Sequence, residues 1–480
     1  MNRVAVDLPV EDAPSAAARV PDDGRLAVSG FGSVGYPKAV PLALAESTGR
    51  TLSLTVVSGG SVGDEIDTAL VEAGAIERRF PYQARPAARE AVNARRIAFQ
   101  DRHIAGLGDE VVSGGLVAPD VAVVEALAVG EDWLIPSTSI GHTPAFVEAA
   151  DRLIVEVNRA QPLSLRRLHD VYRPGRPPNR EPIPLTAPNA RIGESRISFP
   201  REKLVSVVET DRRDSPYAFR DPSSTDRAIA ANLSAFLATE IARNPAFASS
   251  VNLQFGVGSL GNALMGELDG VDVGDRTVAY YGEVIQDSLL DLIDDGTLSV
   301  ASATSLALSA EGQDRLFEDV ERYADGIVLR PADVSNSPEV IRRLGVVAVN
   351  SALEVDLYGH VNSTHVGGTR VLNGVGGSGD FNRNALVSVT ALPSRVRGKG
   401  VSRIVPMVPH VDHTEHDVSV VVTERGVADL RGLGPSERAD LLVEECAHPD
   451  DRPALRAYLD RARGRGGHMP HDLETVFDWA

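Results

Sequence analysis

The chain has 480 residues, of which 43% are hydrophobic and 24% are charged, and its formal net charge at pH 7 is −19. This length accommodates about two to four domains, and the composition is ordinary for an α/β protein. The negative charge argues against a nucleic-acid partner, which requires a basic surface, and no apolar run reaches the roughly 18 residues of a membrane span. An anionic ligand would therefore be held locally, by backbone amides and a few arginines.

The N-terminal segment predicts a protein without a targeting signal. Its first 20 residues carry acids and prolines where a signal peptide needs an apolar stretch, so we expect a cytoplasmic location. Residues 1–25 are predicted to be an unstructured or loosely packed lead-in. Cys446 is the only cysteine, which excludes an intrachain disulfide and a multi-cysteine zinc site. We expect it at the end of an ordinary helix and not as a nucleophile.

Residues 26–215 are predicted to form a first α/β domain. The expected elements are a strand at 26–28, a GxGxxG loop at 30–35, a helix at 37–46, a strand at 51–57, a glycine-rich turn, and a helix at 66–73. Strands continue to alternate with helices up to residue 157. Such alternation is typical of a mostly parallel sheet covered on both faces.

Two irregular segments follow. Residues 173–201 are rich in proline, arginine and asparagine, and we expect a long excursion that embraces the other half of the chain. Residues 211–226, DRRDSPYAFRDPSSTD, have the composition of a linker. A long helix is predicted over 226–243.

Residues 225–480 are predicted to be a second α/β domain that repeats the plan of the first. A strand at 251–255 is followed by the GxGxxG loop Gly256–Gly261 and a helix at 262–268. The fold class is therefore α/β, with two similar open α/β domains that face each other across an active-site cleft.

The stretch TVAYYGEVIQD places one carboxylate at a strand end. Residues 277–281 are apolar and β-branched or aromatic, which predicts a buried strand, and Gly282 permits a tight turn. From Val284 the apolar spacing is helical, with Gly296 as a stop signal. Glu283 would lie at the carboxyl end of the strand, where open α/β sheets bind ligands; the alternative is a solvated loop carboxylate.

The two GxGxxG loops leave alternatives open. Either could approach a phosphate at a helix N-terminus, or could serve only close packing between strand and helix. In a dinucleotide site an acid should follow the next strand. The first loop has TVVSGG there, whereas the second has Glu283, so a nicotinamide-binding interpretation competes on spacing alone.

Two later stretches also suggest ligands. Four glycines within GVGGSGDF, residues 374–381, could expose amides in a concave nest suited to an anion or oxyanion, unless the loop is simply flexible. The stretch HVDHTEHD, residues 410–417, could be a metal cluster. Its three histidines do not match an i, i+4 pair, which favours a hydrogen-bonded turn between strands and no metal site.

A carboxylate is the best candidate for a nucleophile. The chain has no GxSxG elbow, and no serine stands out as part of a hydrolase triad. Glu283, if buried beside glycine amides, could attack a thioester and form an anhydride.

Nine ordered stretches spread over nearly the whole chain carry a resemblance to a known family. They are GFGSVGYPKAVP, VNRAQPLSL, GVGSLGNA, YGEVIQD, SNSPEVIRRLG, NSALEVDLYGHVNST, NGVGGSGDF, PHVDHTEHD and VTERGVADLRGL. On these stretches the chain resembles the acetyl-CoA hydrolase/transferase family, class I CoA-transferases that include succinyl-CoA:acetate CoA-transferases. The resemblance implies two CoA-transferase-like domains, coenzyme A as a substrate, and no tightly bound cofactor.

The resemblance also implies roles for particular residues. Glu283 falls on the catalytic glutamate, which passes through an acyl-glutamyl anhydride and a glutamyl-CoA thioester. Asn336 matches an asparagine that orients this glutamate, the amides of Leu260 and Gly377 match the oxyanion hole, and Glu424 matches a second carboxylate. The residues matching the CoA site are Gly256, Val257, Gly258, Ser259, Leu260, Leu353, Asn373, Gly377 and Arg397. Arg397 stands in a divergent stretch, where relatives often have lysine.

These observations predict a CoA-transferase that uses small carboxylates, acetate and succinate first and propionate next, and that forms a homodimer as relatives commonly do. A close alternative is an acyl-CoA hydrolase, in which water resolves the intermediate. A nicotinamide-binding oxidoreductase and a non-catalytic CoA-binding sensor are the other classes.

Overall fold

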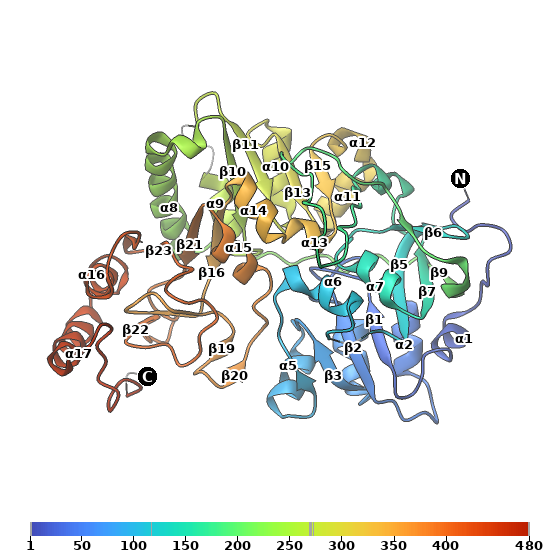
Figure 1. Cartoon of the computed structure of the whole chain (residues 1–480), viewed down its shortest axis with the longest axis horizontal. Helices are drawn as coiled ribbons and strands as arrows, with labels where there is room; N and C mark the ends of the chain where they lie inside the picture. Colours follow the sequence, from blue (N-terminus) through green and yellow to red (C-terminus); the bar gives the residue numbers. More distant parts are fainter. Residues whose placement is uncertain (1, 117, 268–270, 272, 479–480) are drawn as a thin grey trace.

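The computed structural model describes residues 2–116, 118–267, 271 and 273–478. Two large sheets dominate it, one of nine strands and one of eight, and they lie in the first and second halves of the chain (Figure 1). Most strand pairs are parallel, which confirms the predicted α/β class. No described helix has both the length and the apolar character that a bilayer span requires.

The first sheet lies between residues 25 and 210. Its order is β4 (Ala98–Phe99), β3 (Ile76–Phe80), β2 (Leu54–Ser58), β1 (Arg25–Val28), β5 (Val121–Val129), β6 (Trp133–Pro136) and β8 (Ile197–Ser198), while β7 (Arg152–Asn158) pairs with β5 and β9 (Leu204–Thr210). Only the β5–β6 and β6–β8 pairs of this sheet are antiparallel.

Helices cover both faces of this sheet, because successive buried side chains of β1 join different core clusters. They are α1 (Ala13–Ala17), α2 (Ala39–Ala45), α3 (Asp64–Asp67), α4 (Ala69–Glu72), α5 (Pro86–Asn93), α6 (Ile104–Val112), α7 (Thr143–Ala149) and the 3₁₀ turns η1 (Leu163–Arg167) and η2 (Arg201–Lys203). Leu26 packs in one core cluster with Leu44 of α2, whereas Ala27 faces another with Leu107 of α6. The helix predicted at 66–73 divides into α3 and α4 at Thr68.

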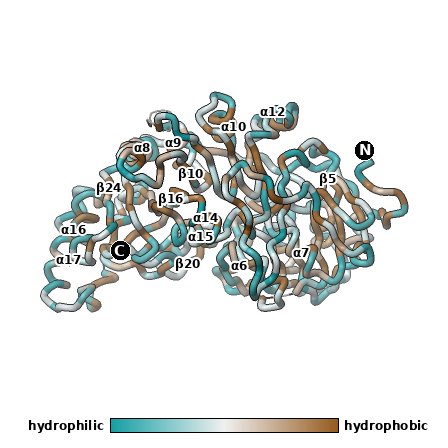
Figure 2. The backbone as a smooth tube through the Cα atoms, turned by 45° about the horizontal axis from the view of Figure 1, so that its top comes forward, coloured by the Kyte–Doolittle hydropathy of each residue, from teal (hydrophilic) through white to brown (hydrophobic). Residues whose placement is uncertain are grey.

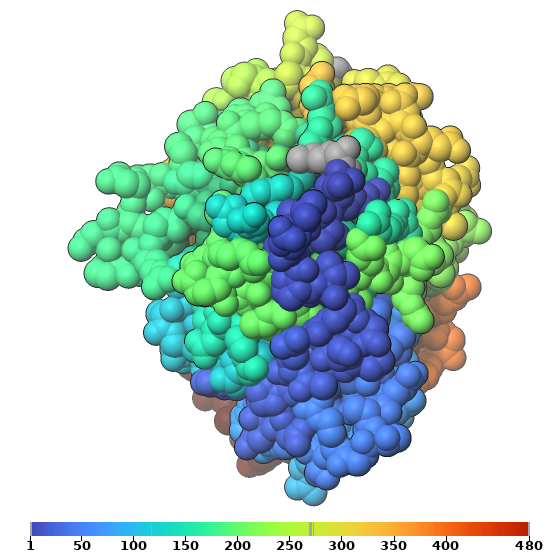
Figure 3. All heavy atoms as spheres, turned by 90° about the vertical axis from the view of Figure 1, so that its right-hand side faces the viewer, coloured from blue at the N-terminus to red at the C-terminus, as the bar shows by residue number. Residues whose placement is uncertain are grey.

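The prediction of a loosely packed lead-in was wrong. Asp12 caps α1, and Ala16, Ala17 and Val20 are fully buried in the core. Val10 also forms a bridge with Val207 of β9. Figure 3 shows the N-terminal residues, in dark blue, lying along this face of the molecule. The sequence did not predict this packing because alanine side chains add little to a hydrophobic pattern, although their small size lets the helix pack closely against the core.

The second sheet repeats the parallel plan. Its order is β15 (Ile327–Leu329), β13 (Val300–Ala303), β11 (Thr277–Tyr281), β10 (Ser250–Phe255), β16 (Val347–Ser351), β21 (Val387–Ala391), β23 (Val420–Thr423) and β24 (Gly426–Asp429). The helical elements are α8 (Ser224–Arg243), η3 (Pro245–Phe247), α9 (Ser259–Glu267), α10 (Asp287–Asp294), α11 (Ala310–Glu318), α12 (Val320–Tyr323), α13 (Ala332–Ser335), α14 (Pro338–Leu344), α15 (Ser378–Asn384), α16 (Pro435–Leu441), the π-helical turn η5 (Leu442–Cys446) and α17 (Arg452–Arg465).

Three small sheets complete the structure. They are β12 (Val284–Ile285) with β14 (Ser305–Leu306); β17 (Glu354–Asp356) with β18 (Val361–Asn362) and β22 (Ile404–Val405); and β19 (His365–Val366) with β20 (Arg370–Val371). The helix predicted from Val284 therefore begins only at Asp287. Val284 and Ile285 are β-branched and extend into β12, which pairs with β14.

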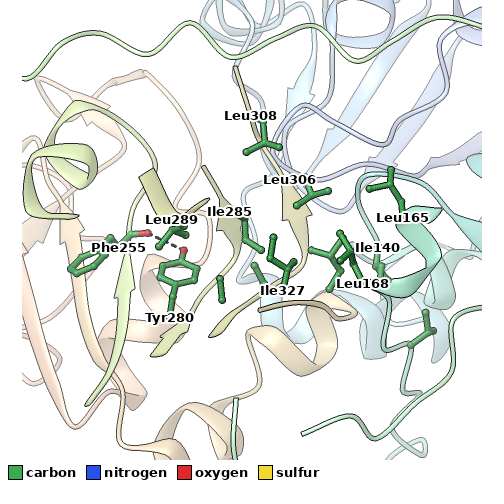
Figure 4. Packing of buried hydrophobic residues seen from close by; sticks show 14 of the residues in the cluster. Ile140, Leu165, Leu168, Phe255, Tyr280, Ile285, Leu289, Leu306, Leu308 and Ile327 are labelled. Atoms are coloured by element: carbon green, nitrogen blue, oxygen red, sulfur yellow. Dashed lines mark hydrogen bonds between the residues drawn. The ribbon is translucent and has the colours of Figure 1, made fainter. Parts of the chain in front are cut away.

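One hydrophobic core joins the two halves. Ile140, Leu165 and Leu168 of the first half lie beside Ile285, Leu306, Leu308 and Ile327 of the second (Figure 4). In Figure 2 the brown, hydrophobic residues gather along inner strands such as β5, while the outer helix α17 is largely teal. A shared core of this kind fixes the geometry of the surface where the halves meet.

The irregular segment at 173–201 embraces the second half, as predicted. Arg330 lies fully buried after β15 and donates to the carbonyls of Pro188 and Ala190 and to Asp170. The backbone of Ile183 donates to Glu339 of α14 at 2.8 Å. These contacts satisfy backbone groups that a segment without regular structure would otherwise leave unpaired.

Candidate active site

A cavity of about 870 Å³ lies where the halves meet. Its walls include eleven of the residues singled out from the sequence: Gly256, Val257, Gly258, Ser259, Leu260, Glu283, Leu353, Asn373, Gly377, Arg397 and Glu424. Asn336 is fully buried behind the wall. The first half contributes Phe31, Ser61 and Tyr82 to the same cavity. A ligand bound here would touch both halves.

Glu283 leaves the end of β11 and turns its carboxylate toward two neutral donors. Asn336, the residue after α13, donates its Nδ2–H to Glu283 Oε1 at 2.9 Å. The backbone of Gly377 forms the other hydrogen bond. A Cβ atom at position 377 would lie 2.1 Å from Glu283 Oε1, so only glycine fits against the carboxylate.

Burial raises the pKa of Glu283 to about 7, while the hydrogen bonds from Asn336 and Gly377 act in the opposite direction. Neither of these partners is charged, so the carboxylate keeps its lone pairs free of a tight ion pair. A desolvated anion of this kind is a better nucleophile than a salt-bridged one.

The glycine-rich loop at 374–377 is clamped by the first half. A Cβ at Gly374 would lie 2.5 Å from the ring of Tyr82 and 2.7 Å from Asp101. Asp101 accepts a hydrogen bond from the backbone of Val375 at 2.5 Å, and burial raises the pKa of Asp101 to about 7. The loop is thus packed and hydrogen-bonded, which supports the interpretation of a rigid nest.

The second GxGxxG loop opens into the cavity. Gly256–Leu260 all line it, and Gly258 has a φ of +131°, a conformation that favours glycine. Among the described residues, no side chain accepts a hydrogen bond from the backbone amides of 257–260. These amides, at the N-terminus of α9, are therefore available to an anionic ligand.

The helix start that follows the first GxGxxG loop is capped by the protein itself. Glu156 of β7 accepts hydrogen bonds from the backbone amides of Lys38, Ala39 and Val40 at 2.8–3.0 Å. Its carboxylate thereby occupies the N-terminus of α2, where a dinucleotide phosphate would bind. A Cβ at Gly35 would lie 2.6 Å from Ser139. These contacts support the packing interpretation at Gly35 and argue against a phosphate at the start of α2, while Phe31 and Gly32 of the loop line the cavity.

Glu424 lies on another wall of the cavity, after β23. Its carboxylate accepts hydrogen bonds from the Ser394 backbone at 2.8 Å and from the Ser394 hydroxyl at 2.5 Å. Burial favours protonation, but these bonds prevail and hold the pKa of Glu424 below its ordinary value. Glu424 therefore remains a fixed negative charge.

Several arginines line the same cavity despite the net charge of −19, although Arg220, Arg395 and Arg425 form ion pairs with acidic side chains. The arginines that line it are Arg220, Arg395, Arg397, Arg403 and Arg425. Arg397 is exposed and makes no ion pair with any described residue. Arginines beside open backbone amides suit a ligand that carries phosphates.

The end of the cavity next to Glu283 is apolar. Phe31, Ile104 and Val284 belong to one small hydrophobic cluster, against which Tyr217 packs. All four side chains line the cavity. Tyr217 comes from the segment 211–223, which has no regular structure and was predicted as a linker.

Sequence reasoning missed several residues of this site. Asp380, Asp101 and Tyr82 were not singled out, although Asp380 lies within GVGGSGDF. Asp380 and Asp101 each have a hydrogen-bond partner more than 200 residues away in the chain, Ala105 and Val375, so no local pattern could identify these contacts.

The stretch 410–417 forms a hydrogen-bonded turn between β22 and β23, as predicted. Asp412 accepts bonds from the Ser363 backbone at 2.6 Å and the Thr364 backbone at 3.0 Å. Within the described ranges, no group of three or more His, Cys, Asp or Glu residues could hold a metal ion. Cys446 is buried in η5.

Family models match both halves of the chain. The acetyl-CoA hydrolase/transferase N-terminal domain matches residues 10–209, and the corresponding C-terminal domain matches residues 312–459. The chain therefore belongs to the acetyl-CoA hydrolase/transferase family of enzymes.

Individual relatives carry two kinds of name. The chain is 42% identical to a succinyl-CoA:acetate CoA-transferase of Clostridium kluyveri, covering 98% of this chain and 88% of that protein. It is 38% identical to a propanoyl-CoA:succinate CoA transferase of Escherichia coli, covering 97% and 96%. It is also 40% identical to an acetyl-CoA hydrolase of Saccharomyces cerevisiae, covering 94% and 89%.

Solved structures share the fold. RipA from Yersinia pestis superposes with a TM-score of 0.71 at 21% identity, covering 94% of this chain and 97% of that one. A 4-hydroxybutyrate CoA-transferase from Porphyromonas gingivalis gives a TM-score of 0.64 at 22% identity, covering 94% and 97%. The two-sheet architecture is therefore that of CoA-transferases.

Proposed function

We propose that the protein is a CoA-transferase that moves CoA from an acyl-CoA to a free carboxylate, with Glu283 as the nucleophile. The observation that carries this proposal is the position of the Glu283 carboxylate. It faces a cavity with open amides and arginines, and its two partners are neutral donors. Coenzyme A enters as a substrate and not as a resident cofactor.

The first half-reaction transfers CoA to the enzyme. A Glu283 oxygen attacks the thioester carbonyl, the C–S bond breaks, and an acyl-glutamyl anhydride and a CoA thiolate result. The thiolate then attacks Cδ of Glu283, and the released acyl group leaves as a carboxylate. The enzyme is left as a glutamyl-CoA thioester, and no proton needs to be moved.

The second half-reaction reverses these steps with a new carboxylate. The backbone amides of Gly377 and Leu260 are assigned to the oxyanions that form in each attack. An oxyanion donor typically contributes about 3 kcal/mol to the rate. Asn336 orients Glu283, and Glu424 supplies a fixed negative charge at the cavity wall.

Coenzyme A is assigned to the wall formed by Gly256–Leu260, Leu353, Asn373, Gly377 and Arg397. Contacts to the long pantetheine arm are remote from the thioester, and their binding energy can be used at the reacting carbon. The names of the relatives point to acetate, succinate and propionate as the carboxylate partners.

Intact mass spectrometry under single-turnover conditions tests the proposal. Incubation with acetyl-CoA should produce a CoA-sized adduct on the peptide that contains Glu283, and Glu283→Gln should abolish it. A wild-type peptide that stays unmodified would contradict covalent catalysis.

A parallel assay of CoA release distinguishes transferase from hydrolase, the activity named in several relatives. We expect turnover to require added acetate or succinate. Turnover at the same rate without a carboxylate would instead identify water as the acceptor.

A further inference from the structure

The side-chain amide of Asn336 donates hydrogen bonds to two carboxylates. Its Nδ2 donates to Glu283 Oε1 at 2.9 Å and to Asp380 Oδ2 at 3.2 Å. The side chain is fully buried, and its Oδ1 has no hydrogen-bond partner among the residues that the structure describes. Both hydrogens of the amide nitrogen are therefore used, one for each carboxylate.

Asp380 is held independently of Glu283. It lies in the first turn of α15 and accepts a hydrogen bond from the backbone of Ala105, at the N-terminus of α6, at 2.9 Å. His103 Nδ1 lies 3.8 Å from Asp380 Oδ1, but burial lowers the pKa of His103, and the nearby Arg383 pairs with Asp417. Only 5% of Asp380 is exposed, so its position is fixed by the contact between the two halves.

This arrangement matters because Glu283 changes its charge during the reaction. As a carboxylate, Glu283 attracts the Asn336 amide strongly, since hydrogen bonds to ionised groups are the strong ones. As an anhydride or thioester it is neutral and holds the amide less well. Because Oδ1 has no hydrogen-bond partner among the described residues, no hydrogen bond on the oxygen side of the amide fixes its orientation.

We propose that Asp380 is a positioning residue for this reaction, which keeps the Asn336 amide nitrogen directed at Glu283 while Glu283 carries the acyl or CoA group. The inference rests on the proposed function. It assigns to Asp380 no contact with the substrate, only an effect through Asn336. The second half-reaction, which starts from neutral glutamyl-CoA, depends on Asp380 more than the first.

The test compares Asp380→Asn with the wild type in pre-steady-state kinetics. Asp380 Oδ2 accepts from both Ala105 and Asn336, so an asparagine oxygen in its place keeps both hydrogen bonds and removes only the negative charge. A hydrogen bond to a neutral acceptor is weaker than one to a carboxylate, which predicts a fall in kcat of about tenfold. We expect KM for acyl-CoA to change by less than about twofold, because no CoA contact is lost. Breakdown of glutamyl-CoA by acetate should slow more than its formation.

A double-mutant cycle separates positioning from a general structural effect. In an Asn336→Ala background, Asp380→Asn should reduce kcat no further, because the residue through which it acts is gone. Additive effects of the two changes would overturn the proposal. Asp380→Ala provides a second pair for the same cycle if the asparagine variant folds poorly.

Two controls keep the outcomes distinct. Glu110→Gln, which removes the half-buried partner of Arg102 from α6, should leave both half-reactions unchanged. If the wild type forms no adduct on Glu283, the proposed function fails. If the adduct forms and Asp380→Asn behaves as the wild type, only the role of Asp380 is refuted.

Discussion

A carboxylate nucleophile must reconcile two opposing demands, and Glu283 shows how this is achieved. Burial strengthens its reactivity but favours protonation, whereas Asn336 and Gly377 stabilise the anion through neutral donors. An arginine in their place would keep the group ionised but would also lower its nucleophilicity. The site therefore has a carboxylate that titrates near neutrality.

The pH dependence of the reaction follows from this balance. With the pKa of Glu283 at about 7, the reactive anion is lost as the pH falls below 7. We expect kcat/KM for acyl-CoA to decrease about tenfold per pH unit below this value and to level off above it. Steady-state assays from pH 5 to pH 9 measure this, and a profile that stays flat down to pH 5 would contradict it.

Glu283 should also lower the stability of the folded protein at high pH. Its pKa is raised from 4.5 to about 7 on folding, so the folded state binds the proton more tightly. The resulting stability is present below pH 4.5 and is lost as the pH rises through 7, by up to about 3 kcal/mol.

Glu283→Gln, which stays neutral, should therefore raise the melting temperature more at pH 8.5 than at pH 5. Differential scanning fluorimetry of the wild type and the variant at both pH values measures this difference in melting temperature. An equal shift at the two pH values would show that the charge of Glu283 is not the cause.

At the scale of single elements, the loop before α15 requires glycine at position 377. A methyl group at Gly377 would overlap the Glu283 carboxylate, 2.1 Å away. Gly377→Ala should thus displace Glu283 or the loop and reduce kcat at least a hundredfold, comparable to removal of an oxyanion donor.

Gly266→Ala on α9 is the matched control, since a Cβ there meets nothing within 4 Å. It should leave activity unchanged and slightly stabilise the helix. Full activity of Gly377→Ala would show that the loop adapts and that its glycine is not required.

Elements could be predicted where one local signal dominates. Strand β11 begins and ends at the predicted residues, because Thr277–Tyr281 is uniformly β-forming and Gly282 ends it. The helix after it was placed three residues too early. The side chains of Val284 and Ile285 fit a helical pattern as well as a strand pattern. They form a strand because they pair with β14.

The same distinction holds for the site. Glu283, Gly377 and the loop 256–260 lie in distinctive motifs, and the structure brings them to one cavity. Asp380 and Asp101 are fixed by partners in the other half, Ala105 and Val375, and these contacts depend on how the two sheets meet. Tertiary contacts of this kind produce no periodic pattern in a single sequence, so they cannot be predicted from it.

At the scale of the whole molecule, the buried pair Arg330–Asp170 ties the halves together. Both side chains are fully buried, and Arg330 also holds the backbone of the irregular segment at Pro188 and Ala190. Arg330→Leu leaves Asp170 buried without its cation. We expect a loss of about 3–5 kcal/mol in the free energy of unfolding.

Arg322→Leu is the control for this change. Arg322 pairs with Asp294 at an exposed position, with 56% of its side chain accessible, and should contribute less than about 1 kcal/mol. Chemical denaturation of both variants provides the comparison. Equal losses would mean that the buried pair does not join the halves.

The hydrogen bonds between Glu156 and the backbone amides at the start of α2 also affect how many molecules of coenzyme A the chain can bind. Because the Glu156 carboxylate belongs to the same chain, it is not lost on dilution, and a free anionic ligand at ordinary concentrations cannot compete with it for these amides. The amides at the start of α2 are therefore occupied, whereas those after β10 are open to a ligand in the cavity. A titration of the protein with coenzyme A should saturate at a single equivalent per polypeptide.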